Sequence, residues 1–425
     1  MDVLVAANTK FCFDLFRKIS KDDYHKNVFF CPLSLSASLA MVRFGARHAS
    51  AHQIDNVLHF LDIYQSESKE PDPCLKSNKQ EAQADSFLQG EKTSTETPNE
   101  QAGTSKDESA LLSCYFGKLL CKLDRAKTDC TLSIANRLYG EQEFPIHPAY
   151  TDGVIQFYHT TIESVDFQRN SEKSRQEINY WVESQSQGKI KDLFSKDTIN
   201  DTTVLVLVNA VYFKPKWENY FDSENTVDAL FSLNEKEKKN VKMMTHTGLH
   251  KLAFLEELIA HVLEMRCSKG ELSMLVLLPS YSDDNLKGLE ELERKITYEH
   301  IVAWSNSENM SEKMVAVSLP QFTLEDSYDL NSVLEDMGIV DIFDETKADL
   351  TGISPTPNLC LSKIVHKTFL EVDENGTQPA AASGAVGPGK SAPSLVEFNA
   401  NHPFLFLIRH NKTQTILFYG RVCSP

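Results

Sequence analysis

The stretch FNANHPFLFLIRHNKTQTILFYGRVCSP, residues 398–425, is dominated by aromatic and branched apolar side chains. Residues 404–422 within it predict buried β-strands, because side chains of these types are enriched in strands. Two further runs, TTVLVLVNAVYF (202–213) and LSMLVLLP (272–279), have the same character and predict more buried strands. A substantial part of the chain is therefore expected to be buried sheet.

Helices are expected elsewhere in the chain. An amphipathic first helix is predicted from apolar residues that recur at helical spacing, which are Leu4, Ala7, Phe11, Leu15 and Ile19. Residues 110–123 and 175–194 also have helical periodicity. The predicted strands and helices do not alternate regularly, so an α+β fold is favoured over a doubly wound parallel sheet.

Composition and charge exclude several classes of partner. The chain has 425 residues, of which 41% are apolar, and its net charge is −17. Such an acidic protein is not expected to bind nucleic acid or an anionic membrane surface. No apolar run approaches the roughly 20 residues that a membrane helix needs.

The N-terminus and the cysteines point to a reducing compartment. Asp2 stands where a signal peptide would be basic, and Lys10 and Asp14 interrupt any apolar run, so no cleavable signal is predicted. The nine cysteines include no C-x-x-C pair, and they are expected to be free thiols. A cytoplasmic protein is predicted, with leaderless export an open alternative.

Residues 64–108 differ abruptly in composition from the rest of the chain. They contain few large apolar residues and many Glu, Lys, Gln, Ser and Thr. A segment of this kind buries too little surface to offset the entropy of ordering it. We predict a disordered insertion, and a passive loop is favoured over a tether for crosslinking.

The sequence GAVGPGKS, residues 384–391, matches the phosphate-loop pattern G-x-x-x-x-G-K-[ST]. A working phosphate loop follows a buried strand and begins a helix. Here GTQPAAAS precedes the motif and APSLVEFN follows it, and neither has the required character. Nucleotide binding is therefore not predicted, and no cofactor is expected.

Other candidate sites are weak. His48 and His52, and likewise His246 and His250, are i,i+4 pairs without an apparent third ligand, so solvated histidines are favoured over a metal site. A mildly basic stretch could contact a polyanion, although a solvated helix face is favoured; it consists of Lys118, Lys122, Arg125 and Lys127. No metal ion is predicted.

Four segments together resemble one protein family over nearly the whole chain. They are NVFFCPLSLSASLAMV (27–42), VNAVYFKPKWENYF (208–221), LSKIVHKTFLEVDENGT (361–377) and the C-terminal stretch 398–425. The sequence is similar to the serpins, the serine protease inhibitors, and in particular to their ovalbumin-type intracellular branch, clade B. The resemblance implies one domain over residues 1–425, with three β-sheets, about nine helices and an exposed reactive-centre loop. The loop would span residues 376–397, and the insertion would lie between the third and fourth helices.

The resemblance also implies a cleavage site. In the family a hinge glycine lies fifteen residues before the cleaved bond, counting the cleaved residue as one, and from Gly376 that count ends at Lys390. Lys390 is also the only basic residue between Gly376 and Phe398. A lone cation on a flexible segment suits the acidic specificity pocket of a trypsin-like protease. The predicted scissile bond is therefore Lys390–Ser391.

In the family the cleaved loop inserts into the largest sheet and traps the protease, so its inward side chains should be small. The predicted hinge comprises Gly376, Thr377, Gln378, Pro379, Ala380, Ala381, Ala382 and Ser383. Pro379 does not fit, because a proline in a central strand removes a ladder donor and fixes φ. The expected cost is about 1–3 kcal/mol, which would slow insertion roughly tenfold to a hundredfold. A protein that is cleaved as a substrate without trapping is the alternative.

A polar cluster beneath the large sheet, the shutter, controls its opening in the family. The resemblance assigns Ser34, Asn209 and His366 to this cluster, with Cys31 in a position where serine is usual. A thiol is a weaker hydrogen-bonding group than a hydroxyl. The expected partner is a trypsin-like serine protease in a covalent acyl-enzyme complex. The protein itself is expected to be a monomer without enzymatic activity.

Overall fold

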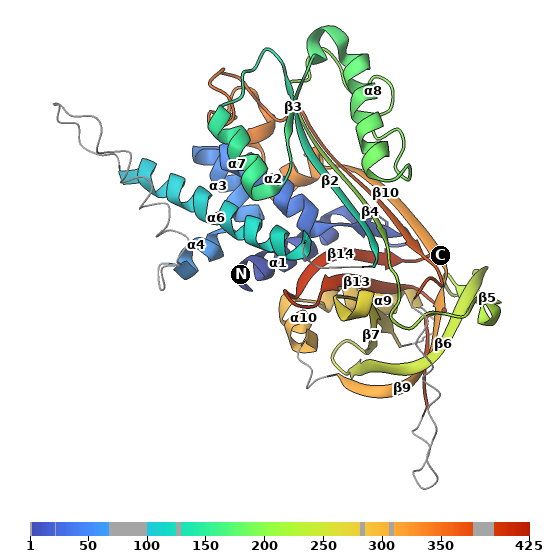
Figure 1. The fold of residues 1–425 in the computed structure, drawn as a ribbon. Coiled ribbons are helices and arrows are strands. Elements are labelled where there is room, and N and C mark those ends of the chain that lie inside the picture. Colours follow the sequence, from blue (N-terminus) through green and yellow to red (C-terminus); the bar gives the residue numbers. More distant parts are fainter. Residues whose placement is uncertain are drawn as a thin grey trace, which may run out of the picture.

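In a computed structural model of the chain, the structure describes residues 2–21, 23–67, 100–124, 129–280, 285–305, 310–376 and 395–425. Two hydrogen-bonded sheets and ten α-helices are found within these ranges (Figure 1).

The first sheet has five strands. Their order is β10 (Phe322–Asp329), β11 (Lys363–Val372), β4 (Leu205–Lys214), β2 (Thr131–Glu141) and β3 (Ile162–Val165). Strand β4 pairs parallel to β11 and antiparallel to β2. Its side chains alternate between two core clusters, with Leu207 in the larger cluster and Val206 and Val208 in the smaller. Because β4 is covered on both faces, it is an almost continuous apolar run.

The second sheet has nine strands. Eight follow in the order β1 (Val28–Phe30), β14 (Thr415–Val422), β13 (Phe404–His410), β8 (Leu272–Pro279), β7 (Ala260–Cys267), β6 (Lys238–Leu255), β9 (Ser311–Pro320) and β12 (Val396–Asn399), while β5 (Val227–Ser232) pairs with β6. Three sheets were expected, and the described residues form two. The reason is the 18-residue strand β6, which pairs with β5 over its first residues, with β9 along its middle and with β7 at its end.

Helices cover both faces of the five-stranded sheet. Helix α8 (Phe167–Gln185) lies on one face of the sheet (Figure 1). Its Ile178 and Val182 belong to the smaller core cluster, together with Val206 of β4. Helix α2 (Pro32–Gly45) contacts β4 on the other face and also contacts β14, so it lies between the two sheets. The remaining helices are α1 (Asp2–Ile19), α3 (His48–Val57), α4 (Leu61–Glu67), α6 (Glu100–Asp124), α7 (Pro148–Tyr158), α9 (Asn285–Lys295), α10 (Tyr298–Ser305) and α11 (Asn331–Met337).

The strands predicted from apolar runs are confirmed as β4, β8 and the pair β13–β14. The predicted helix 110–123 lies within α6, and the predicted first helix is α1. The helix predicted over 175–194 is wrong in its second half, because α8 ends at Gln185. Gln187 and Gly188 follow with φ of 56° and 77°, a left-handed conformation that ends a right-handed helix.

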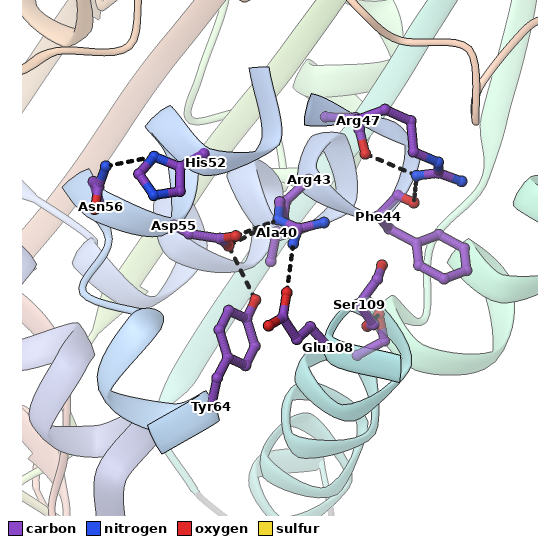
Figure 2. A network of polar contacts seen from close by, with 12 residues as sticks. Ala40, Arg43, Phe44, Arg47, His52, Asp55, Asn56, Tyr64, Glu108 and Ser109 are labelled. Carbon is purple, nitrogen blue, oxygen red and sulfur yellow. Dashed lines mark hydrogen bonds and ion pairs between the residues drawn. The ribbon is translucent and has the colours of Figure 1, made fainter. Parts of the chain in front are cut away.

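The predicted 64–108 insertion is wrong at both ends. Residues 64–67 belong to α4, and residues 100–108 belong to α6. The hydroxyl of Tyr64 donates to Asp55 Oδ1 at 3.0 Å, and Asp55 is itself 2.8 Å from Nε of the buried Arg43 (Figure 2). Glu108 Oε2 lies 4.0 Å from Arg43 Nη2. Because α4 follows α3, the remaining stretch, residues 68–99, starts after the fourth helix and lies outside the described residues.

Candidate functional site

The centre of the five-stranded sheet is the parallel junction between β11 and β4. The two strands pair in register from Lys363 opposite Val206 to Leu370 opposite Phe213. The chain leaves this sheet after Val372 and joins the other sheet at Val396. A strand that turned back from the end of β11 and entered the junction would be antiparallel to both neighbours, and so could form regular ladders with each.

A row of polar side chains crosses this junction within an otherwise apolar interior. Asn136 of β2 lies opposite Asn209 of β4, and Asn209 lies opposite His366 of β11. Asn209 Nδ2 is 2.7 Å from Asn136 Oδ1, and His366 Nδ1 is 2.5 Å from Asn209 Oδ1. Side-chain hydrogen bonds therefore connect three neighbouring strands, in addition to the backbone ladder.

Side chains from the first turns of α2, which packs against this sheet, complete the cluster. Asn209 Nδ2 is 2.6 Å from Ser34 Oγ and 3.0 Å from Ser38 Oγ. Cys31 is the N-cap residue of α2, and its Sγ accepts from the Ser34 backbone N–H at 3.4 Å. The cluster thus connects the helix between the two sheets to the central strands of one of them.

His366 is neutral and has a defined tautomer. Its Nε2 accepts from the Cys31 backbone N–H at 3.0 Å, so the ring proton is on Nδ1 and is donated to Asn209. The side chain is completely buried, and burial lowers the pKa of His366 to about 3. A second proton, on Nε2, would point at the Cys31 backbone N–H and would have no acceptor, so the charged form of the ring is disfavoured.

The segment that follows β11 is held at the end of the sheet. Trp217 Nε1 donates to the Asp373 carbonyl at 2.8 Å, and the Trp217 backbone N–H donates to the Asn375 carbonyl at 3.0 Å. Lys214 Nζ lies 2.6 Å from Asp373 Oδ2. Residues up to Gly376, which forms a bridge with Trp217, are therefore in fixed positions.

Gly376 lies where no side chain would fit. A Cβ atom there would be 2.5 Å from Tyr220 Cα and 2.9 Å from the Trp217 carbonyl oxygen. Both neighbours are backbone atoms, so they cannot move aside as the end of a side chain can. Close packing against the Trp217–Tyr220 segment, and not a left-handed backbone, accounts for this glycine.

The structure brings all four predicted shutter residues into one hydrogen-bonded cluster. They are Cys31, Ser34, Asn209 and His366. Two members, Ser38 and Asn136, were not predicted. Asn136 lies between Ala135 and Arg137 in β2, with its side chain in the cluster. A polar side chain at an inward position of a strand was the signal that could have predicted its role.

Of the predicted hinge, only Gly376 lies in the described residues. The remaining hinge positions, Thr377, Gln378, Pro379, Ala380, Ala381, Ala382 and Ser383, lie outside them. Lys390 and Ser391, and with them the phosphate-loop motif 384–391, are also outside. The position of the scissile bond therefore remains a prediction.

The predicted histidine pairs have different environments. His48 lies 2.7 Å from Asp349 and His52 lies 2.9 Å from Asn56, so the two rings have separate partners. The prediction of solvated rings is wrong for His250, which is buried, with its ring 5.6 Å from that of His246. The reason is that this part of β6 packs in the interior of the larger sheet. Within the described ranges, no three metal-ligating side chains gather closely enough to hold an ion.

Three other predictions bear on the surface and the cysteines. In the predicted basic stretch Lys122 is exposed and Lys118 is half-buried, with its Nζ 5.7 Å from the centre of the Tyr115 ring, while Arg125 and Lys127 lie outside the described residues. The eight cysteines in the described parts of the chain are free thiols. None of the described helices is long and apolar enough to cross a bilayer.

Comparison with known proteins agrees with this architecture. The family model described as Serpin (serine protease inhibitor) matches residues 6–425. Serpin B12 of Homo sapiens is 73% identical over 425 residues, and Serpin B12 of Mus musculus is 65% identical over 426, each with 100% of both chains covered. The crystal structure of uncleaved ovalbumin matches with a TM-score of 0.79 at 33% identity, covering 99% of this chain and 100% of that chain.

Proposed function

The chain belongs to the serpin family, and we propose that it inhibits trypsin-like serine proteases by trapping them as a covalent acyl-enzyme. The description of the family, serine protease inhibitor, names serine proteases as the targets of its inhibitors. Trypsin-like specificity is the finer part of the proposal, and it depends on Lys390.

Lys390 is the residue that we propose the protease recognises and cleaves after. Its ammonium group would enter the acidic specificity pocket of the protease, and the catalytic serine would attack the Lys390 carbonyl carbon. An ester to the protease then forms, and the amine of Ser391 leaves. The count from Gly376 supports this position, and the fixed place of Gly376 beside Trp217 supports its use as the start of the moving segment.

The observation that carries the proposal is the parallel β11–β4 junction. The loop leaves β11 at the end of the sheet where β4 also ends, so an inserted loop would run antiparallel to both strands. Fifteen extended residues span about 50 Å, enough to carry the attached protease to the opposite end of the sheet. Distortion of the protease there would prevent hydrolysis of the ester, provided that insertion is faster than deacylation.

Opening the junction requires the polar row to separate. The bond between His366 and Asn209 joins the two strands that would part, and α2 supports Asn209 through Ser34 and Ser38. Each net hydrogen bond is worth about 0.5–1.5 kcal/mol, and the buried groups would need new partners after opening. The cluster therefore favours the closed sheet before cleavage, as expected of a shutter.

Pro379 favours a second function. In the proposed inserted strand it would lack a ladder donor, and the delay could let water release the protease first. The protein would then be a substrate that is cleaved at Lys390–Ser391 and traps nothing. Both functions need only a monomer, and neither needs a cofactor.

Incubation with trypsin followed by a denaturing gel distinguishes the two functions. A band at the summed mass of the two proteins, resistant to boiling in detergent, is expected for an inhibitor. Complete conversion to a product cleaved after Lys390 would overturn the trapping proposal. A thermal unfolding scan of the cleaved product tests insertion separately, because an inserted strand should raise the unfolding temperature of the cleaved form well above that of the intact protein.

A further inference from the structure

A cysteine, a histidine and an aspartate lie in a line on the surface, where the ends of α6 and α7 meet. Cys121 Sγ is 3.6 Å from His159 Nε2, and His159 Nδ1 is 2.8 Å from Asp124 Oδ2. Cys121 and Asp124 come from the last turns of α6. His159 ends α7 in a left-handed conformation with φ of 53°, which directs its ring toward α6.

The order of the three groups matches that of an activated nucleophile. Asp124 accepts the Nδ1 proton of His159, which leaves Nε2 as the acceptor that faces the thiol. A base that is oriented in this way can take the thiol proton and expose the thiolate, the reactive form. Cys121 is half-buried, and 33% of the His159 side chain is exposed, so reagents can reach the sulfur.

A cavity of about 580 Å³ adjoins this line and is lined in part by Asp124 and His159. About half of its wall is apolar, and this half includes Leu120, Leu123, Leu132, Ile134 and Leu417. Arg137 also lines the cavity, where its Nη1 lies 3.5 Å from Glu163 Oε1 and its guanidinium carbon lies 4.2 Å from the centre of the Trp181 ring. The cavity thus has room for an apolar chain.

We propose that Cys121, His159 and Asp124 form a nucleophilic thiol site at which an α,β-unsaturated aldehyde with an apolar chain adds to the sulfur. Addition needs no leaving group and no oxidant. The thiol proton passes to His159 Nε2, the sulfur electron pair forms a bond to the β-carbon, and the C=C electrons move to form an enolate. The imidazolium then returns the proton to the α-carbon, so every atom of both reactants remains in the adduct.

Competitive alkylation with trans-2-nonenal at neutral pH, followed by peptide mass spectrometry, tests the site. Cys360 is an internal control, because it is also partly exposed but its thiol pKa is raised by burial and by nearby Glu345 and Asp344. Cys121 is expected to react at least about tenfold faster than Cys360. Equal rates at the two cysteines would overturn the proposal.

Variants separate base catalysis from simple exposure. The His159→Asn variant keeps a residue that tolerates a left-handed backbone but removes the base, and it should slow Cys121 at least about tenfold. Asp124 is a positioning residue, so Asp124→Ala should slow the reaction and Asp124→Glu should restore most of the rate. If His159→Asn leaves the rate unchanged while its unfolding temperature matches that of the parent, the proposed role of His159 is wrong.

The contribution of the cavity is tested with a second aldehyde. Propenal has the same reactive group as trans-2-nonenal but no chain, so the preference for nonenal over propenal reports on binding of the chain. Ile134 lines the cavity and is 36% exposed, so Ile134→Ser should fold normally. This variant should reduce the nonenal preference severalfold and leave the propenal rate unchanged. An unchanged preference would exclude the cavity as the site of the chain.

Discussion

His366 of β11 donates its Nδ1 proton to Asn209 of β4 over 2.5 Å, directly across the junction that the proposed mechanism must open. The two residues occupy opposed register positions, so the bond lies perpendicular to the strands. An entering strand cannot pass this point until the bond breaks. The bond is therefore expected to affect the stability of the closed sheet and the rate at which it opens.

Replacing Asn209 with alanine should destabilise the protein by about 2–4 kcal/mol. The change leaves Ser34, Ser38 and His366 buried without their shared partner, and unsatisfied buried groups cost more than a lost bond. Urea unfolding followed by circular dichroism measures the loss. Asn240→Ala on the exposed part of β6 is the matched control and should change stability by less than about 0.5 kcal/mol. Equal effects of the two changes would contradict the proposed role of the cluster.

The stability contributed by His366 should depend on pH. Its pKa is about 3 in the folded protein and roughly 6.5 when unfolded, so the unfolded chain binds the proton more readily between these values. Stability from this residue is complete above about pH 6.5 and is lost as the pH falls toward 3, by up to about 1.4 kcal/mol per unit. Burial raises the pKa of Glu293 to about 7 and that of Asp326 to about 6, and these groups act in the opposite direction.

The comparison that isolates His366 is therefore between the parent protein and His366→Gln. The variant should be less stable at pH 7, and its deficit should shrink as the pH is lowered from 6 to 4. Urea midpoints across this range measure the difference. A deficit that stays constant with pH would mean that His366 is protonated in the folded protein.

Replacing Gly376 with alanine should cost about 1–3 kcal/mol, because the new Cβ would press on Tyr220 Cα and the Trp217 carbonyl. The base of the loop would have to move, and the trapped fraction with trypsin should fall as well. Gly288→Ala is the control: a Cβ at this position in α9 meets Pro279 Cβ at an ordinary 3.5 Å, so the variant should be as stable as the parent or more so. Thermal unfolding of both variants checks the pair.

Replacing Lys390 with alanine should abolish rapid cleavage by trypsin and the formation of any covalent complex. The cation is what the acidic specificity pocket recognises, so kcat/KM for cleavage should fall by at least about a hundredfold. Lys173→Ala provides the control, since Lys173 is an exposed lysine on α8, and it should behave as the parent does. If trypsin still cleaves rapidly after residue 390 in the alanine variant, the proposed recognition of the Lys390 side chain is wrong.

Replacing Pro379 with alanine should raise the trapped fraction. If the proline slows insertion roughly tenfold to a hundredfold, its removal should let insertion finish before the acyl-enzyme ester is hydrolysed in a larger fraction of molecules. Titration of trypsin activity measures how many inhibitor molecules are consumed for each protease molecule trapped. An unchanged ratio would mean that Pro379 does not limit insertion.

Local sequence patterns predicted the central strands, and the family resemblance assigned four of the six residues of the polar cluster. Asn136 was missed because its role depends on the register of β2 against β4, a pairing between segments about seventy residues apart that the local pattern of β2 does not determine. The joining of two expected sheets through β6 was missed for the same reason.

The ends of the insertion were misplaced for a different reason. Composition averages over many residues, whereas Tyr64 and Glu108 are anchored by single partners, Asp55 and Arg43. The polar composition around them predicts disorder, and only the fold supplies the buried ion pair that they contact. Contacts of this kind cannot be predicted from a window of sequence, because each depends on one distant residue.

This anchoring also makes the stretch between α4 and α6 a suitable place for protein engineering. Tyr64 and Glu108 hold the two flanking helices beside the same buried pair, and these contacts do not depend on how many residues join the helices. Doubling the number of residues in a closed loop costs only about 0.6 kcal/mol. A fluorescent domain or an affinity tag inserted between residues 68 and 99 should therefore leave the rest of the molecule folded and its proposed reaction with trypsin unchanged.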